Sequence, residues 1–119
     1  LTMGDGWETR RRREPGNDWI VVQLGTTGTI DEIEIDTAHF KGNFPDMCSI
    51  QAALVEKGFD LNLAEKWKEI LPKQKLSADA IHTFSSEIIK DFGPVNAIRL
   101  NIYPDGGVSR LRVLGRVEL

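Results

Sequence analysis

Reactive side chains are densest in residues 36–46, which read Asp-Thr-Ala-His-Phe-Lys-Gly-Asn-Phe-Pro-Asp. Carboxylate, imidazole, amine and amide groups stand together here, in a segment that begins at the end of a predicted strand. Loops beyond strand ends are where rigid scaffolds usually present reactive groups, and histidine exchanges protons near neutral pH. Asp36 could orient His39 or share a proton with it, so this pair is our candidate for acid–base chemistry. A hydrogen-bonded structural loop with a satisfied histidine is the alternative.

A second group of polar residues alternates along two predicted strands near the C-terminal end: Arg99, Asn101 and Tyr103 on one, then Arg110 and Arg112 on the next. Alternate residues of a strand share one face, so pairing of these strands would create a basic, amide-bearing surface. Arginine binds carboxylates through paired hydrogen bonds, which would suit an anionic small molecule. Cross-strand charge pairing with the acidic segment 30–37 explains the arginines equally well.

A metal site would need the 2 histidines of the chain. His39, His82 and Asp36 could in principle provide two imidazoles and a carboxylate. No closely spaced pair of ligands supports such a site. The sequence also contains no phosphate-binding glycine loop, nucleophile elbow or zinc-type spacing of Cys and His. We therefore expect neither a metal ion nor another cofactor.

Near the N-terminus, Trp7 and Trp19 lie among carboxylates and turn residues, with the arginine run 10–13 between them. Exposed tryptophans could stack on a sugar, whereas buried ones would tie down a structural loop. The arginines could form an anion or nucleic-acid patch. Because successive residues of a strand face opposite ways, at most two of them could converge on one site. We favour a solvated, charge-neutralising role for most of the run.

Composition limits the class of protein. A length of 119 residues fits one domain, and 15 basic against 18 acidic residues give a net charge of −3. This balance argues against bulk nucleic acid as the main partner, and no apolar run approaches the ~20 residues that a membrane helix needs. The single cysteine, Cys48, excludes an internal disulfide and fits a reducing compartment. We expect a soluble intracellular domain.

Strand patterns must position the reactive groups. They cover segments 19–24, 30–37, 49–55, 96–103 and 108–117. A turn at Gly25–Gly28 separates the first two segments. The residues Pro104–Gly107 predict a tight turn that joins the last two segments in a hairpin. Several short strands separated by turns indicate a β-sandwich or barrel.

One segment, residues 61–71, carries a helical pattern. Its apolar residues lie at helical spacing: Leu63, Trp67, Ile70 and Leu71. Asn62 could cap the start of this helix, and Pro72 would end it. The competing interpretation is an extended segment that buries Trp67. We expect at most this one short helix in an otherwise all-β domain.

Four phrases of the sequence resemble the allantoicase (allantoate amidinohydrolase) family. They begin at Asp5 (Asp-Gly-Trp-Glu-Thr-Arg-Arg), Pro15 (Pro-Gly-Asn-Asp-Trp), Asp36 (the loop above) and Arg99 (Arg-Leu-Asn-Ile-Tyr-Pro-Asp-Gly-Gly-Val-Ser-Arg-Leu-Arg-Val). The family's chains are similar to a tandem of two related modules, each resembling a galactose-binding-like jelly-roll β-sandwich. The resemblance implies that residues 1–119 form one module, the C-terminal one. It also implies two partners, a second module of the same chain and further copies in a homo-oligomer.

The resemblance further implies a reaction, the hydrolysis of allantoate to ureidoglycolate and urea in purine degradation. The central carbon of allantoate carries a carboxylate and two ureido nitrogens, so releasing urea breaks one carbon–nitrogen bond. A general acid should protonate the leaving nitrogen, and a general base should activate water. Asp36 and His39 are our candidates for these steps.

Binding groups should hold the substrate in place. Our candidates for the carboxylate are Arg10, Arg99 and Arg110, and those for the ureido ends are Lys41, Asn43, Asn101 and Asp105. The alternative function is a non-catalytic galactose-binding-like module for a ligand or a carbohydrate. A third is a scaffold or subunit-contact fragment. We expect a cytoplasmic protein, with the peroxisome as the alternative compartment and without nucleic-acid or membrane partners.

Overall fold

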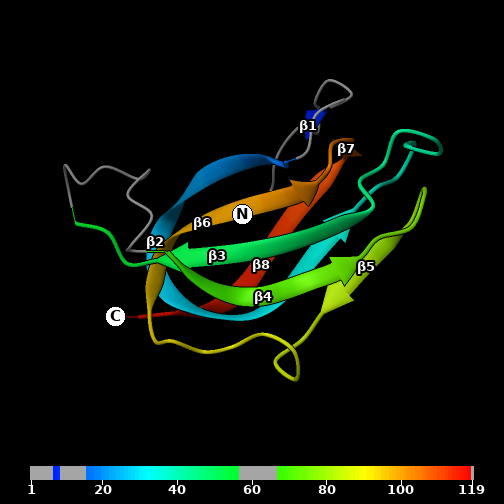
Figure 1. Cartoon of the computed structure of the whole chain (residues 1–119). Helices are drawn as coiled ribbons and strands as arrows, with labels where there is room; N and C mark the ends of the chain where they lie inside the picture. The colour runs from blue at the N-terminus through cyan, green and yellow to red at the C-terminus, as the bar shows by residue number, and fades with distance from the viewer. Residues whose placement is uncertain (1–6, 9–15, 57–66, 119) are drawn as a thin grey trace.

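The computed structural model describes residues 7–8, 16–56 and 67–118, and every regular element among them is a β-strand (Figure 1). The strands are β1 (Trp7–Glu8), β2 (Asp18–Asp36), β3 (Met47–Ala53), β4 (Lys68–Lys75), β5 (Ile81–Phe84), β6 (Val95–Tyr103), β7 (Gly107–Val108) and β8 (Arg110–Val117). The predicted all-β class is confirmed. Within this described part, no helix has the length and apolar character to cross a bilayer.

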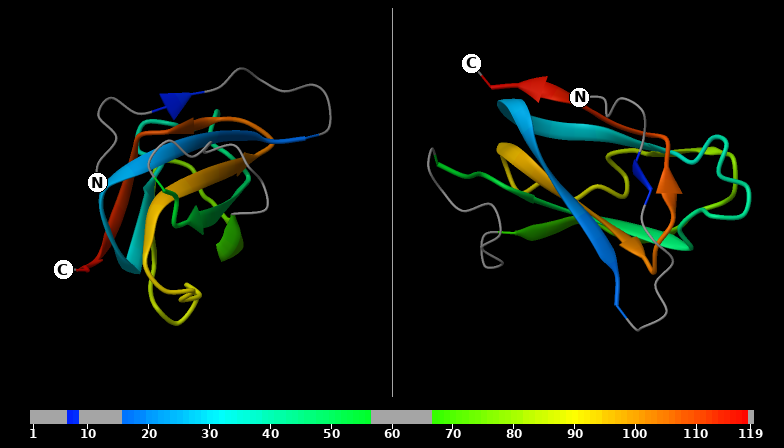
Figure 2. Two further views of the ribbon diagram at one scale, coloured as in Figure 1. Left: turned by 90° about the vertical axis from the view of Figure 1, so that its left-hand side faces the viewer. Right: turned by 90° about the horizontal axis from the view of Figure 1, so that it is seen from above.

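The long strand β2 belongs to two layers. Its first half pairs antiparallel with β6, from Asp18 opposite Ile102 to Gly28 opposite Val95. Its second half pairs with β8 on one side and with β5 on the other. A large layer therefore has the order β4-β3-β6-β2, and a small layer has the order β5-β2-β8. Figure 2 shows the bend at which β2 passes from one layer to the other.

This bend lies at the predicted turn, Gly25–Gly28. The chain does change direction here, but the 19 residues of β2 form one strand with a register shift between Gln23 and Gly28. The prediction of two strands separated by a turn is therefore wrong. A Cβ on Gly28 would overlap the carbonyl oxygen of Arg116 on β8. Glycine at this position lets the bent strand approach β8 closely.

The predicted hairpin between segments 96–103 and 108–117 does not form. β6 lies in the large layer between β3 and β2, whereas β8 lies in the small layer beside β2. Between them, β7 pairs with β1, with Trp7 opposite Val108. Because β2 offers a pairing edge in both layers, residues 104–107 carry the chain from one layer to the other instead of folding it back.

The hydrophobic core fills the space between the two layers. The inward residues of β6 are fully buried, as the alternation predicts: Ile98, Leu100 and Ile102. Ile33 and Ile35 of β2 are also fully buried. Burying a side chain of this size stabilises a fold by about 1.5–3 kcal/mol. The same alternation places the polar residues of these strands on the outer faces of the layers.

The helix predicted for residues 61–71 is wrong over its last part, and residues 61–66 lie outside the described residues. From Lys68 onward the chain is β4, which pairs antiparallel with β3. The β3–β4 ladder shifts register around Ile50, and the adjacent residues Ile70 and Leu71 are both buried. An irregular ladder can bury two consecutive residues, which imitates the apolar spacing of a helix.

Trp67 matches the competing interpretation, an extended segment that buries this residue. It is buried just before β4, in a small apolar cluster with Ala53 and Ala97. Pro72 does not end an element but lies inside β4. Because β4 is the last strand of the large layer among the described residues, the missing N–H of Pro72 disrupts no further ladder on its outer side.

Candidate functional site

Three loops meet at the end of the sandwich where β2 and β6 terminate, on the right in Figure 1. Residues 37–46 follow β2, residues 76–80 follow β4, and residues 104–106 follow β6. Backbone hydrogen bonds join the first and last of these loops. The Asp46 N–H donates to the Tyr103 carbonyl at 2.9 Å, and the Gly107 N–H donates to the Asn43 carbonyl at 2.8 Å. Two of the four family-like phrases therefore form one structural unit.

Adjacent glycines allow this close packing. Gly106 has a φ of 133°, and a Cβ on it would lie 2.6 Å from the backbone carbon of Phe44. A Cβ on Gly107 would overlap the ring of Phe40. Only glycine fits both positions, so this glycine pair fixes how the two loops contact each other.

The predicted acid–base pair lies at the start of the loop 37–46. The Asp36 carboxylate accepts a hydrogen bond from the Ala38 N–H at 2.8 Å, and the His39 N–H donates to the Asp79 carboxylate at 2.8 Å. His39 has a φ of 73°, a left-handed conformation uncommon outside glycine. Its side chain is exposed, and among the described residues no hydrogen bond joins its ring to Asp36. The catalytic assignment stays a prediction.

Other predicted residues lie at the same end. Lys41 and Asn43 are exposed in the loop after β2, and Asp105 is half-buried in the loop after β6. Arg110 begins β8 directly opposite Asp36, so the two side chains share a face. Arg10 lies outside the described residues. The structure thus gathers several of the charged and amide candidates around one end of the sandwich.

His82 has structural contacts on both ring nitrogens. Its Nε2 accepts a hydrogen bond from the Ser77 N–H at 2.8 Å, and its Nδ1 lies 3.0 Å from the Ile35 carbonyl oxygen. Because Nε2 accepts, the proton of the neutral ring is on Nδ1 and is donated to Ile35. In the described ranges, no group of three or more His, Cys, Asp or Glu could hold a metal ion.

The outer face of the small layer carries paired charges. Arg112 on β8 lies opposite Glu34 on β2, with 3.2 Å between Nη1 and Oε2. Arg116 contacts Asp31 with 3.2 Å between Nε and Oδ2. The interpretation of the arginines as cross-strand partners of the acidic segment is confirmed for Arg112, and Arg116 makes a similar contact. Arg99 and Arg112 lie in different layers, so the single basic surface expected from a hairpin does not form.

The outer face of the large layer carries a different group. Arg99 stacks on Trp19, with 4.3 Å from its guanidinium carbon to the ring centroid. The Nε of Arg99 is buried and has no hydrogen-bond partner among the described residues. Gln51 on β3 lies directly opposite Arg99. Sequence reasoning missed Gln51, although alternation in the strand candidate 49–55 could have placed it on the outer face.

Asn101 is the centre of a hydrogen-bond network beside Arg99. Its Nδ2 donates to Ser49 Oγ at 3.3 Å and to Gln51 Oε1 at 3.2 Å, and its Oδ1 accepts from Asn17 Nδ2 at 3.4 Å. Ser49 Oγ lies 2.9 Å from the Tyr103 hydroxyl. Asn101 is 5% exposed. Its amide is engaged within the protein, which suits positioning of its neighbours.

Cys48 lies on β3 next to Ser49 but faces the core, where it is fully buried. Burial raises the pKa of its thiol to about 12. The thiolate is the nucleophilic form of cysteine, and at neutral pH this thiol stays protonated. Covalent catalysis through the single cysteine of the chain is therefore excluded.

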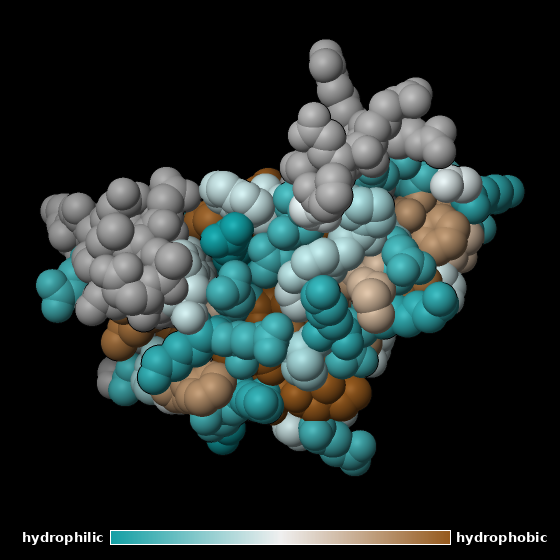
Figure 3. All heavy atoms as spheres, in the orientation of Figure 1, coloured by the Kyte–Doolittle hydropathy of each residue, from teal (hydrophilic) through white to brown (hydrophobic). Residues whose placement is uncertain are grey.

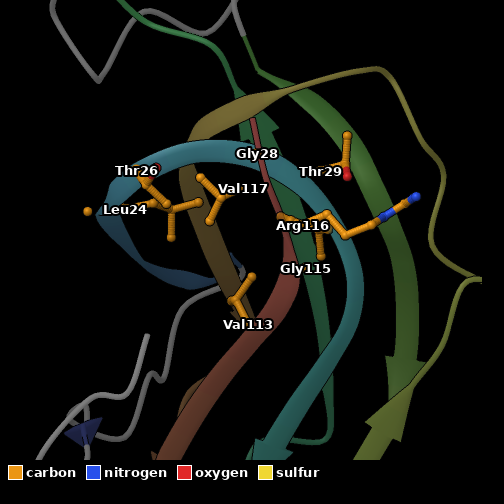
Figure 4. A pocket seen from close by; sticks show the side chains of 10 residues that line it. Leu24, Thr26, Gly28, Thr29, Val113, Gly115, Arg116 and Val117 are labelled. Carbon is orange, nitrogen blue, oxygen red and sulfur yellow. The ribbon is translucent and has the colours of Figure 1, made fainter. Parts of the chain in front are cut away.

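A pocket of about 170 Å³ lies at the opposite end of the sandwich, at the bend of β2 (Figure 4). Leu24, Val113 and Val117 line it together with glycines and threonines. Arg116 also borders it, but its side chain extends away from the cavity in Figure 4 and pairs with Asp31. The described residues that line this apolar pocket include no acid–base pair, and the pocket is separate from the loops that carry the candidate residues.

Comparisons with known proteins agree with the fold and with the sequence phrases. A sequence model described as the allantoicase repeat matches residues 1–118. Proteins named "Probable allantoicase" from Pseudomonas fluorescens (strain SBW25) and Rhizobium meliloti (strain 1021) are 58% and 56% identical over 121 residues each. These matches cover 99% and 97% of this chain, but 36% of each relative.

Solved structures define the class of fold. The crystal structure of allantoicase from Saccharomyces cerevisiae aligns with a TM-score of 0.77 at 41% identity, over 93% of this chain and 31% of that one. The C-terminal domain of a chitobiase from Bacteroides fragilis has a TM-score of 0.66 at 18% identity, which indicates the fold alone. The two layers form a β-sandwich of the galactose-binding-like class, as predicted. This chain belongs to the allantoicase family, of which it is one repeat.

Proposed function

We propose that this chain is one repeat of an enzyme that hydrolyses allantoate to ureidoglycolate and urea. The observation that carries this proposal is the convergence of family-like phrases at one end of the sandwich. There the loop after β2 and the loop after β6 are hydrogen-bonded to each other. They bring Asp36, His39, Lys41, Asn43 and Asp105 to a single end of the fold.

The proposed reaction breaks one carbon–nitrogen bond at the central carbon of allantoate. A water oxygen bonds to that carbon, the electron pair of the broken bond leaves with the ureido nitrogen, and this nitrogen takes up a proton to give urea. His39, which is exposed, exchanges the protons, and Asp36 assists. Arg10, Arg99 and Arg110 are the proposed cations for the carboxylate. Lys41, Asn43 and Asp105 serve the ureido ends, whereas Asn101, whose amide is hydrogen-bonded within the protein, positions its neighbours.

The proposal also covers the second module, the assembly and the compartment of the whole enzyme. The chain spans 36% of the length of the curated relatives it matches. We infer that residues 1–119 form one module, that a second module of the same chain contributes to the active enzyme, and that the enzyme is a homo-oligomer. The proposed compartment is the cytoplasm, with the peroxisome as the alternative.

Urea release from allantoate by the intact protein tests the function. Replacing His39→Ala should lower kcat by at least about 100-fold, the usual scale for one acid–base group. His39 faces solvent, so the folded state should survive the change. Thr83→Ala, at an exposed position of β5, is the control. Absence of urea release from the unaltered protein would refute the activity, and normal release after His39→Ala would refute only this residue assignment.

A further inference from the structure

Arg99 has an aromatic partner but no polar one in the part of the chain that the structure describes. Its Nε is buried and makes no hydrogen bond, and no ion pair among the described residues includes it. Stacking on Trp19 orients the guanidinium but satisfies none of its N–H groups. A buried donor without an acceptor is rare in folded proteins and needs an explanation. The buried Nε itself is closed to a ligand, but the Arg99 side chain is only half-buried, so a ligand acceptor can reach the outer N–H groups of the same guanidinium.

Gln51, opposite Arg99 in the β3–β6 ladder, is oriented by the neighbouring network. Its Oε1 accepts a hydrogen bond from Asn101 Nδ2 at 3.2 Å. The oxygen of this amide is therefore turned toward Asn101, which leaves its Nε2 hydrogens free to donate elsewhere. Among the described residues, no acceptor takes them. Arg99 and Gln51 thus present N–H donors side by side.

The same reasoning fixes the proton of Tyr103. Ser49 Oγ accepts from Asn101 Nδ2 at 3.3 Å and lies 2.9 Å from the Tyr103 hydroxyl. Ser49 is 2% exposed, so its own hydroxyl proton needs an acceptor inside the protein. In the described part of the chain, the Tyr103 hydroxyl oxygen is the only such acceptor. Tyr103 therefore has its own proton available to donate outward.

The charges around these three residues favour an anionic ligand. Lys73 Nζ lies 4.4 Å from the centroid of the Tyr103 ring. Glu69 stands opposite Gln51 on the edge strand β4, but it is exposed and, in the described ranges, makes no hydrogen bond to Gln51 or Arg99. Figure 3, which looks onto the strands of this layer, shows mainly hydrophilic residues between the two grey regions.

We propose that Arg99, Gln51 and Tyr103, here called the donor face, bind a small carboxylate that carries carbonyl oxygens at its other end. Arg99 and Gln51 take the carboxylate oxygens. The Tyr103 hydroxyl is linked to Gln51 through Ser49 Oγ and Asn101 Nδ2, so it lies on the same face and donates to a carbonyl at the other end of the ligand. Asn101 and Ser49 are positioning residues, because they fix which atoms of their neighbours donate.

The donor face deepens the proposed function, and its ligand is allantoate only if that function holds. Allantoate combines one carboxylate with two ureido carbonyls, which is the acceptor pattern that this face would take. The donor face ends at Tyr103, whose carbonyl accepts a hydrogen bond from the Asp46 N–H of the loop 37–46. A ligand held by its carboxylate at Arg99 would thus extend toward the loops that carry the acid–base candidates.

Binding of N-carbamoylglycine, a carboxylate with one ureido group, tests the donor face in the intact protein. Gln51→Glu retains an acceptor for Asn101 but replaces the outward N–H donors with a negative charge. We expect calorimetry to show binding at least about tenfold weaker, the scale of a lost charge-assisted hydrogen bond. Gln23→Glu makes the same change at an exposed position of β2, opposite Ala97, and should alter binding less than about twofold.

Three results would overturn the donor face: no binding of N-carbamoylglycine by the unaltered protein, equal binding by Gln51→Glu, or equal binding of the uncharged N-carbamoylglycinamide. Tyr103→Phe removes only the hydroxyl and should weaken binding of the acid by severalfold. A different result would refute the proposed function without refuting the donor face. A protein that binds the probe through Gln51 but releases no urea from allantoate would retain the donor face and lose the reaction.

Discussion

The outer faces of the two layers carry arginines in opposite chemical situations. On the small layer, Arg112 is paired with Glu34 across neighbouring strands. On the large layer, Arg99 lies on the ring of Trp19, and its buried Nε has no acceptor within the described ranges. On one face Arg112 has a carboxylate partner, whereas on the other, among the described residues, Arg99 is an oriented donor without an acceptor for its Nε. An arginine's sequence context alone does not distinguish these roles; the strand that lies beside it does.

The difference follows from the pairing of β2. Its second half lies beside β8, so the arginines of β8 are next to acidic residues. Its first half places Trp19 beside β6, so Arg99 has an aromatic ring on one side and the amide of Gln51 on the other. Paired surface charges are usually worth little to stability. An arginine held without a carboxylate is the better candidate for binding one from solution.

The largest expected effect separates the two arginines by activity. In the intact protein, Arg99→Gln should lower kcat/KM for allantoate about 100-fold, because a charge-assisted contact to the substrate carboxylate is lost. Arg112→Gln removes the same charge from the other face and should change kcat/KM less than about twofold. Urea release measured over a range of allantoate concentrations provides both values.

Thermal unfolding of the same variants tests whether a loss of activity comes from a loss of stability. Arg99→Gln removes the stacking on Trp19, a contact worth about 0.5–1 kcal/mol, so the unfolding midpoint should fall by only a few degrees. Equal losses of activity in both variants, or a loss in Arg99→Gln that is explained by unfolding, would contradict the assignment of Arg99 to binding.

A smaller effect, on stability, is expected from removing Asn101, the centre of the hydrogen-bond network on the large layer. Asn101→Ala leaves the buried Ser49 hydroxyl and the Gln51 carbonyl without their donor, which should cost about 1–3 kcal/mol. Thr83→Ala, at an exposed position opposite Glu34 on the small layer, should stay within about 0.5 kcal/mol. Denaturant unfolding measures both. Equal stability of the two variants would mean that the network is not a structural unit.

The sequence predicts which face a residue occupies better than it predicts which strand lies beside it. Alternation over 96–103 correctly buries Ile98, Leu100 and Ile102 and turns Arg99 outward. The predicted pairing of segments 96–103 and 108–117 was wrong. Turn-forming residues such as those at 104–107 occur both where a chain folds back and where it crosses to another layer. Only the bend of β2, which supplies an edge to both layers, decides between these outcomes.

The candidate site shows the same limit. The loop 37–46 was recognisable from its composition, and the structure places it at the end of the sandwich with the loop after β6. Gln51 and Ser49 have no reactive character of their own and gain their roles from Asn101. A residue whose function is to orient a neighbour becomes visible only when the ladder between β3 and β6 is known.

The smallest effect concerns the ion pair of the small layer. The side chains of Arg112 and Glu34 are 43% and 20% exposed, so water and salt screen their attraction. A double-mutant cycle of Glu34→Ala and Arg112→Ala should yield a coupling free energy of about 0.5 kcal/mol, falling further in 1 M salt. A coupling that stays above about 2 kcal/mol in high salt would show that this pair is a structural element. The contrast between a solvated face and a binding face would then no longer hold.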